Sequence, residues 1–194
     1  KIAVVGAGYV GLVTAACFAE IGNYVICIDI DEQKISHLNN GVIPIYEPGL
    51  DKLVVKNRKE NKLEFSTDLK SSIRQSDVIF ICVGTPPKEN GESDLSHVEN
   101  GARSIAEAMD SYKVIVEKST VPVETGEKVG KSIRAYNIHK VDFDVVSNPE
   151  FLREGSAVND FMHPDRIVIG CESERAKHII KNLYGPLKAP MLFT

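Results

Sequence analysis

Short apolar runs alternate with longer amphipathic segments along the 194 residues. Most of the short runs are continuously apolar rather than alternating, which is typical of strands buried on both faces of a parallel sheet. The strands expected from these runs are residues 1–5, 24–29, 62–66, 77–83, 113–118, 143–147 and 166–170.

The segments between these strands have apolar residues at helical spacing. The expected helices are residues 10–21, 32–39, 49–59, 69–75, 95–109, 123–135 and 174–184. In the fifth of them, Leu95, Val98, Ala102, Ile105, Ala106 and Met109 form one apolar stripe. Strands alternating with helices of this length predict right-handed strand–helix–strand units in an α/β fold with a doubly wound, mostly parallel sheet.

Residues 2–19 contain no charge, as a signal peptide or a membrane span would. Two features argue against both. The glycines fall in the pattern G-x-G-x-x-G, and the composition changes from β-branched residues to Ala-rich sequence partway along. A strand that turns tightly into a helix explains both features. No other segment is long enough to span a bilayer, so we expect a soluble, cytoplasmic protein without membrane partners.

The sequence GAGYVG at residues 6–11 follows an apolar strand and precedes an Ala-rich helix, the context that a Rossmann-type dinucleotide-binding domain requires. Gly6 makes the tight turn, Gly8 admits a pyrophosphate, and Gly11 lets helix and strand pack closely. With Tyr9 and Val10 these glycines form the expected phosphate loop. The helix N-terminus adds N–H groups and about half a positive charge.

Asp29 ends the second expected strand, eighteen residues after Gly11. A carboxylate there accepts hydrogen bonds from a ribose diol and repels a 2′-phosphate, which favours NAD over NADP. The alternative role, capping the next helix, suits Asp31 better. Lys34 either reaches the adenosine side or is a solvated lysine, and spacing does not separate these roles.

The other strand ends carry polar residues at the edge where such sheets bind ligands. Thr85 follows one strand and Thr120 another. Thr120 could instead cap the helix signalled by Pro122 and Glu124, but the third residue after it is Val123, so a capping box is missing.

After the sixth strand the sequence SNPEFLREGSA places Glu150 and Glu154 four residues apart. Like charges at this spacing repel on a helix, and Asn148-Pro149 and Gly155 suit a shaped turn better. The pair is either a solvated surface pair or a group that performs acid–base chemistry beside a nicotinamide. The residues alone leave both interpretations open.

A net charge of −4 gives no basic surface, so nucleic acid is an unexpected partner. The four cysteines, Cys17, Cys27, Cys82 and Cys171, have no metal-binding spacing, and we expect reduced structural thiols and no metal site. Cys171, which follows Gly170 at a strand end, is expected to be the most exposed of them.

These motifs together resemble the NAD-binding domain of the UDP-glucose/GDP-mannose dehydrogenase family. The matching segments, in the order of that family, are GAGYVG, CIDID, IYEPGL at 45–50, VGTPP, KSTVP, NPEFLREGSA and PDRIVIG at 164–170. NPEFLREGSA resembles the glucose branch most, with GDP-mannose or another UDP-sugar as the alternative substrate.

The resemblance implies oxidation of the C6 hydroxymethyl of UDP-glucose to a carboxylate, with two NAD and one water. It places Gly6, Gly8, Gly11, Asp29, Lys34, Thr85, Thr120 and Glu154 at the NAD site. It also places Glu150, Phe151, Leu152, Arg153 and Glu154 at the nucleotide-sugar. Thr120 and Glu150 would position a water for proton transfer and for the final hydrolysis.

The family's nucleophilic cysteine, which carries the thiohemiacetal and thioester, belongs to a later domain, and none of the four cysteines here has its context. The chain begins with Lys1 and ends with PMLFT. We therefore expect residues 1–194 to be the NAD-binding domain of a longer enzyme, without its central helix and substrate domain. Alone it should be inactive, and the intact enzyme should be a homodimer or larger. A non-catalytic NAD-binding module is the alternative from another class.

Overall fold

The computed structural model describes residues 1–88, 93–119 and 125–194. Six parallel strands form the main sheet in the order β3-β2-β1-β4-β5-β6. They are β1 (Ile2–Val5), β2 (Val25–Ile28), β3 (Leu63–Ser66), β4 (Val78–Ile81), β5 (Lys113–Glu117) and β6 (Phe143–Ser147). The doubly wound α/β fold expected from the sequence is confirmed.

The four central strands are buried along their whole length because helices cover both faces of the sheet. β1, β2, β4 and β5 have no exposed residue, which explains their continuous apolar runs. β1 pairs with both β2 and β4, with Val5 opposite Ile28 on one side and Ile81 on the other. The strand order therefore reverses at β1, and the crevice beyond the carboxyl ends of β1 and β4 is where such sheets bind ligands.

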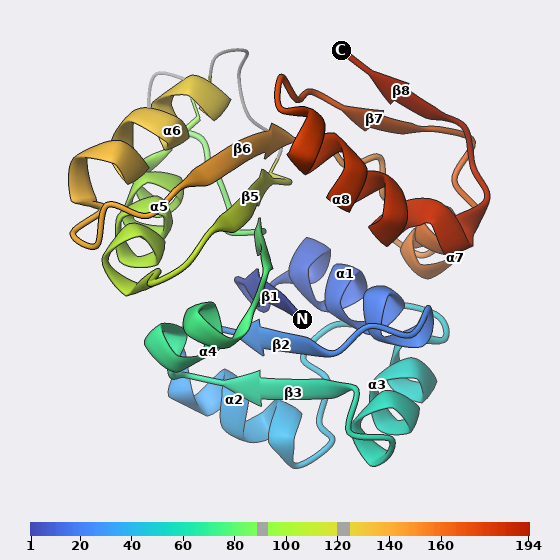
Figure 1. Ribbon diagram of the computed structural model, residues 1–194. Helices are drawn as coiled ribbons and strands as arrows, with labels where there is room; N and C mark the ends of the chain where they lie inside the picture. The colour runs from blue at the N-terminus through green and yellow to red at the C-terminus, as the bar shows by residue number, and fades with distance from the viewer. Residues whose placement is uncertain (89–92, 120–124) are drawn as a thin grey trace.

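The helices lie in two groups, one on each face (Figure 1). Buried side chains of α1 (Tyr9–Glu20), α2 (Glu32–Asn39), α3 (Leu50–Lys59), α7 (Ala157–Met162) and α8 (Glu174–Tyr184) belong to one apolar core. Those of α4 (Leu69–Gln75), α5 (Ser96–Ala108) and α6 (Thr125–Tyr136) belong to the other. This division follows from right-handed crossovers running in opposite directions from β1.

The last part of the chain forms a separate layer. β7 (Ile167–Ile169) pairs in parallel with β8 (Met191–Phe193), and a short 3-10 helix, η1 (Gly185–Leu187), follows α8. The seventh expected strand therefore does not extend the main sheet. It touches β6 only through an isolated bridge between Ser147 and Gly170. Figure 1 shows this layer in red beside α1.

Aromatic packing joins this layer to the main sheet. The ring of Phe18 on α1 lies 5.1 Å from that of Phe161 on α7 and 5.2 Å from that of Tyr184 on α8. It also lies 4.9 Å from the ring of Phe80 on β4. Ring pairs at these distances add to the stability gained by burial.

Three helices, α2, α4 and α8, have the bounds expected from the sequence. Their first turns carry side-chain caps from Asp31, Asp68 and Ser173 respectively, which fixes where each helix starts. α7 and β8 were not predicted, because six and three residues are too few to show a period. In the part of the chain described here, no helix combines the length and hydropathy that a bilayer crossing needs.

Candidate functional site

The phosphate loop adopts the conformation that its three glycines were predicted to allow. Gly6 has φ +104°, and a Cβ there would lie 2.7 Å from the carbonyl oxygen of Cys82. A Cβ on Gly11 would lie 1.8 Å from the carbonyl oxygen of Gly6. A Cβ on Gly8 would meet nothing within 4 Å. Gly6 and Gly11 are thus required by packing within the chain, whereas the absence of a side chain at Gly8 leaves room in front of the helix.

The N-terminus of α1 faces this space with its polar groups uncapped by side chains. Gly8 is the N-cap residue, makes no side-chain cap, and is followed by a first turn without acidic residues. The amides of the first turn of a helix lack partners within the helix and carry a partial positive charge. The loop therefore fits a diphosphate, which is consistent with the predicted roles of Gly8, Tyr9, Val10 and Gly11.

Asp29 lies directly after β2, beside the phosphate loop. Its Oδ2 accepts a hydrogen bond from the amide of Ala7 at 2.8 Å, and its Oδ1 accepts one from the amide of Asp31 at 3.0 Å. A carboxylate oxygen accepts two hydrogen bonds, so Oδ1 retains capacity for a hydroxyl donor. The position suits the predicted contact with a ribose diol.

Lys34 forms an ion pair with Asp29, and its predicted place at the NAD site stays a prediction. Its Nζ donates to Oδ2 of Asp29 at 2.9 Å, and the lysine side chain is 30% exposed. Its backbone amide donates to Oδ1 of Asp31, which confirms Asp31 as the helix cap. Burial opposes the ionisation of Asp29, but hydrogen bonds from Lys34, Asp31 and Ala7 outweigh it and lower the pKa of this carboxyl.

Thr85 is half-buried and follows the end of β4 at the same sheet edge. The hydroxyl of Ser119 donates to the carbonyl of Val83 at 2.9 Å, which joins the end of β5 to this segment. Thr120 lies outside the described residues, so its predicted role stays a prediction.

The segment from Glu150 to Glu154 is not helical, as the sequence predicted. Oδ1 of Asn148 lies in a buried network described below, and Oε2 of Glu150 accepts the amide of Leu152 at 2.7 Å. Gly155 closes the turn with φ +87°. We call residues 147–155 the sugar-facing loop, after the role that the resemblance gives to residues 150–154 within it.

Arg153 anchors this loop to α7. Its Nη2 and Nε lie 2.6 and 3.1 Å from the two carboxylate oxygens of Asp160. Hydrogen bonds from Arg153 hold the pKa of Asp160 down at about 2 despite the opposing effect of burial. The guanidinium is therefore paired with a carboxylate although the arginine side chain is 76% exposed, and the predicted contact of Arg153 with the nucleotide-sugar stays a prediction.

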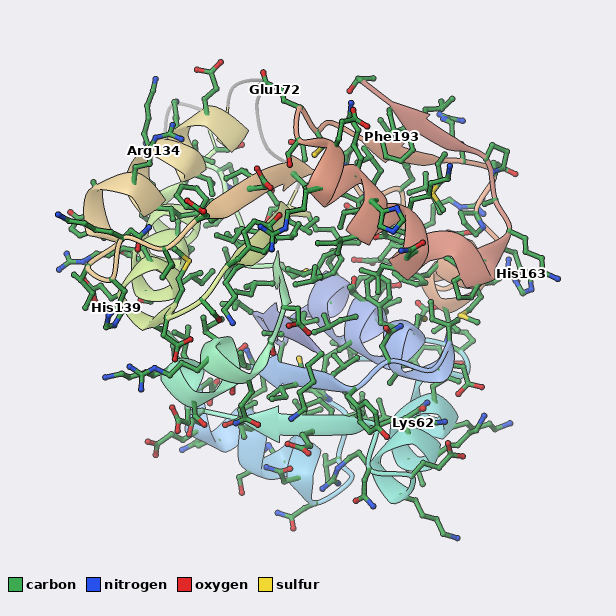
Figure 2. All side chains as sticks on the ribbon, viewed as in Figure 1. Lys62, Arg134, His139, His163, Glu172 and Phe193 are labelled. Atoms are coloured by element: carbon green, nitrogen blue, oxygen red, sulfur yellow. The ribbon has the colours of Figure 1, made fainter. Side chains whose placement is uncertain are left out.

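A cavity of about 360 Å³ opens beside the sugar-facing loop. Its lining includes Glu150, Phe151 and Leu152 from the loop, and residues 163–167 from the segment that leads into β7. Figure 2 shows His163, one of the lining residues, on the side of the molecule formed by α7 and α8. Four of the five predicted substrate residues, Glu150, Phe151, Leu152 and Arg153, line this cavity, whereas Glu154 does not.

A buried lysine that the sequence interpretation missed supports the loop from beneath. Nζ of Lys118 donates to Oδ1 of Asn148 at 3.1 Å and lies 3.5 Å from the hydroxyl of Tyr184, which also donates to that Oδ1. Lys118 is 5% exposed, and burial lowers its pKa. The side-chain nitrogen of Asn148 donates to the carbonyl of Val168 at 2.9 Å. The oxygen and the nitrogen of this side chain are therefore both hydrogen-bonded, which fixes the turn before Glu150.

Glu117 is a second buried ionisable group at this end of β5. It is 2% exposed, and burial raises its pKa to about 7, although the amide of Ser119 and the charge of Lys118 act in the opposite direction. The signal for both residues was present in the sequence as two charges at the end of a continuous apolar run.

All four cysteines are free and buried. Burial raises the pKa of the Cys17 and Cys82 thiols to about 12, which keeps them protonated. Cys171, expected to be the most exposed of the four, shares the highest exposed fraction with Cys82, but that fraction is only 6%, and the thiol of Cys171 donates to the carbonyl of Ser173 at 3.4 Å. The β7–β8 layer, which the sequence pattern did not reveal, covers it.

Comparison with known sequences gives one family. Residues 1–188 match the profile described as UDP-glucose/GDP-mannose dehydrogenase family, NAD binding domain. The chain is 56% identical over 194 residues to the UDP-glucose 6-dehydrogenase TuaD of Bacillus subtilis (strain 168), covering 100% of this chain and 42% of the relative. It is 51% identical over 200 residues to the UDP-glucose 6-dehydrogenase of Rhizobium meliloti (strain 1021), covering 100% and 46%.

Comparison with solved structures agrees. A UDP-glucose dehydrogenase from the hyperthermophilic archaeon Pyrobaculum islandicum is similar with a TM-score of 0.96 and 40% identity, over 100% of this chain and 45% of that chain. A GDP-mannose dehydrogenase from Pseudomonas aeruginosa, solved as a ternary complex, gives 0.95 and 38%, over 100% and 46%. The chain spans less than half the length of each of these four proteins.

Proposed function

The chain belongs to the UDP-glucose/GDP-mannose dehydrogenase family, whose NAD-binding domain it matches, and from that premise we propose that it serves a UDP-glucose 6-dehydrogenase. One observation carries the proposal: the phosphate loop, the carboxylate of Asp29 and the sugar-facing loop meet at one edge of the sheet. Glu47 joins the phosphate loop and the sugar-facing loop there, because it accepts hydrogen bonds from Tyr9 of the first loop and from Gly155 of the second.

NAD, when bound, supplies the hydride acceptor. In the proposed site the first turn of α1 binds the diphosphate in the space in front of Gly8, where no side chain intervenes. Asp29 accepts the ribose hydroxyls, and Lys34 keeps this carboxylate ionised. Thr85, Thr120 and Glu154 complete the coenzyme contacts in this proposal.

The sugar-facing loop presents the C6 hydroxymethyl to the coenzyme. We assign Glu150, together with Thr120, to positioning the water that takes part in transfer of the hydroxyl proton to solvent and in the final hydrolysis of the acyl group. The backbone and side chains of Phe151, Leu152 and Arg153 line the nucleotide-sugar, with Arg153 contributing mainly as the anchor to Asp160. Supporting this assignment, Glu150 is half-buried in a fixed turn at the cavity wall.

The remaining chemistry requires residues beyond this chain. The relatives are more than twice as long, so we propose that residues 1–194 form the NAD-binding domain of a longer enzyme. A cysteine nucleophile, a central helix and a substrate domain would lie outside it. The intact enzyme would be a cytoplasmic homodimer or larger assembly, a location that suits four free, buried thiols.

GDP-mannose is the second candidate substrate. The similarity to the Pseudomonas aeruginosa GDP-mannose dehydrogenase, at a TM-score of 0.95, favours it, because the two branches share this domain. The higher identity to the two UDP-glucose 6-dehydrogenases, 56% and 51%, favours UDP-glucose. A non-catalytic NAD-binding module would not need the buried hydrogen bonds among Lys118, Asn148 and Tyr184 that hold the sugar-facing loop.

The test compares initial rates of NADH formation by the intact enzyme that contains this chain, with UDP-glucose and with GDP-mannose. We expect UDP-glucose to be oxidised with the higher kcat/KM, and two NADH to form for each UDP-glucose consumed. Preference for GDP-mannose would assign the chain to the second candidate. NAD binding without oxidation of either sugar would support the non-catalytic module.

A further inference from the structure

Glu47, a residue of the IYEPGL segment, is buried between the phosphate loop and the sugar-facing loop, although the proposed chemistry gives it no role. Glu47 is 4% exposed, whereas the preceding Tyr46 is 89% exposed. Burying an acid while exposing the adjacent aromatic ring is the reverse of what apolar burial alone favours. A carboxylate in this position has to be held by specific hydrogen bonds.

A single oxygen of Glu47 contacts both loops. Oε2 accepts a hydrogen bond from the hydroxyl of Tyr9, in the first turn of α1, and another from the amide of Gly155 at 2.8 Å. The Tyr9 hydroxyl also lies 3.3 Å from the Gly155 amide and 3.4 Å from the carbonyl oxygen of Arg153. Burial, together with the hydrogen bond to Glu47, raises the pKa of Tyr9 to about 12, so the phenol remains a neutral donor.

In the part of the chain that the structure describes, the side-chain hydrogen bonds of Glu47 are confined to one of its two carboxylate oxygens. Oε1 is buried and has no hydrogen-bond partner among the described residues. A buried polar atom without a partner destabilises a fold, and an apolar side chain would avoid that loss. The side-chain hydrogen bonds of Glu47 among the described residues therefore all go to the two loops that it joins.

We propose that Glu47 is a positioning residue that fixes the sugar-facing loop at Gly155 against the first turn of α1. The bond to the Gly155 amide sets the direction of the preceding residue, Glu154, which the proposed function places between coenzyme and sugar. The phosphate loop and the sugar-facing loop then move as one unit, so occupation of the diphosphate site tightens the backbone beside the sugar. The identity of the two ligands rests on the proposed function, but the link between the loops is a property of this chain alone.

Amide hydrogen exchange, followed by NMR on the isotopically labelled 194-residue chain, tests the proposal. Without ligand, the Gly155 amide should exchange at least about tenfold faster in Glu47→Ala than in the wild type, because it loses the nearer of its two acceptors. Glu47→Gln retains an acceptor oxygen and should give an intermediate rate. Saturating NAD should slow exchange of the Gly155 amide in the wild type and leave it unchanged in Glu47→Ala.

A pair of matched variants separates positioning from general destabilisation. Tyr9→Phe removes a tyrosine–carboxylate hydrogen bond inside the link. Tyr112→Phe removes one outside it, where the Tyr112 hydroxyl donates to Oδ2 of Asp144 at 2.6 Å. Exchange at Gly155, relative to the amides of β1, should accelerate in Tyr9→Phe and not in Tyr112→Phe.

Equal exchange at Gly155 in wild type and Glu47→Ala would overturn the proposal, as would equal acceleration by Tyr9→Phe and Tyr112→Phe. If Glu47→Ala does not fold, Glu47→Gln and Tyr9→Phe decide the question by the same comparison. Failure of the wild-type chain to bind NAD would contradict the proposed function instead. The ligand-free comparison would still test the link.

Discussion

Nζ of Lys34 lies 2.9 Å from Oδ2 of Asp29, at the carboxyl end of β2. The lysine comes from the first turn of α2, whose start is fixed by the Asp31 cap, so the ion pair joins the end of the strand to the helix that follows. The carboxylate is 11% exposed and remains ionised, since these contacts lower its pKa against the effect of burial. A fixed anion here favours hydroxyl donors and disfavours a phosphate.

This arrangement predicts preference for NAD over NADP. Asp29→Ala should weaken NAD binding by about 1–3 kcal/mol, because hydrogen bonds to a charged acceptor are lost. The neighbouring Asp31→Ala is the matched control: it should lower the free energy of unfolding by about 1 kcal/mol through loss of the cap and leave NAD affinity nearly unchanged. Calorimetric titrations with both coenzymes measure these effects. Equal affinity of the wild type for NAD and NADP, or an unchanged Kd in Asp29→Ala, would contradict the assignment.

Gly8 and Gly11 of the phosphate loop predict opposite phenotypes for the same substitution. Gly8→Ala places a methyl group in open space and should change the free energy of unfolding by less than about 1 kcal/mol. It should nevertheless weaken NAD binding at least about tenfold, since the methyl group occupies the space assigned to the diphosphate. Gly11→Ala brings a Cβ to 1.8 Å from a carbonyl oxygen and should destabilise the chain by about 3 kcal/mol or more.

Urea unfolding and NAD titration of both variants check this contrast. A Gly8→Ala chain that binds NAD as tightly as the wild type would show that the diphosphate lies elsewhere. A Gly11→Ala chain of wild-type stability would show that the close contact between α1 and Gly6 is absent.

Glu117 predicts a pH dependence of stability that follows from its raised pKa. Its unfolded pKa is near 4.5 and its folded pKa is about 7, so between these values the folded state binds more protons. The stabilisation that this group contributes is complete below pH 4.5 and is lost as the pH rises through 7. The loss amounts to no more than about 3 kcal/mol.

Glu117→Gln should remove this dependence, because an amide does not titrate. The difference in free energy of unfolding between wild type and variant, measured in urea from pH 5 to pH 8, should shift in favour of the variant as the pH rises. A difference that stays constant across this range would show that the carboxyl of Glu117 titrates normally in the folded state.

The chain alone should produce no NADH from UDP-glucose. Its four thiols are buried and free, those of Cys17 and Cys82 are held protonated, and the proposed nucleophile belongs to a part of the enzyme outside these residues. Absorbance at the NADH band, with the intact enzyme as positive control, measures the rate. Steady turnover by residues 1–194 would show that one of these four cysteines, or another group in the chain, acts as the nucleophile.

The parts of the fold that the sequence predicted are those governed by local chemistry. The glycine spacing predicted the turn from β1 into α1. The short polar side chain of Asp31 predicted the start of α2, so Asp29 was not needed as the cap of that helix. Continuous apolar runs predicted four central strands that are buried throughout. Each of these signals lies within a few residues of the structure that it specifies.

The supports of the site could not be predicted because they join residues far apart in the chain. Glu47 binds Tyr9 across 38 residues and Gly155 across 108, and no local pattern marks such pairs. Lys118 meets Tyr184 only because α8 packs onto α1, which the pattern of residues 174–184 does not specify. The extent to which Cys171 is buried could not be predicted for the same reason, since the β7–β8 layer that covers it depends on a three-residue strand.

Chemical-shift mapping of NAD onto the labelled chain tests the central claim most directly. We expect the largest changes at the amides of Gly8, Tyr9, Val10 and Gly11, with smaller ones at Asp29 and at the amide of Gly155. Saturation should be reached with NAD at concentrations where NADP produces weaker shifts. Changes confined to another surface, or none at millimolar NAD, would contradict the account.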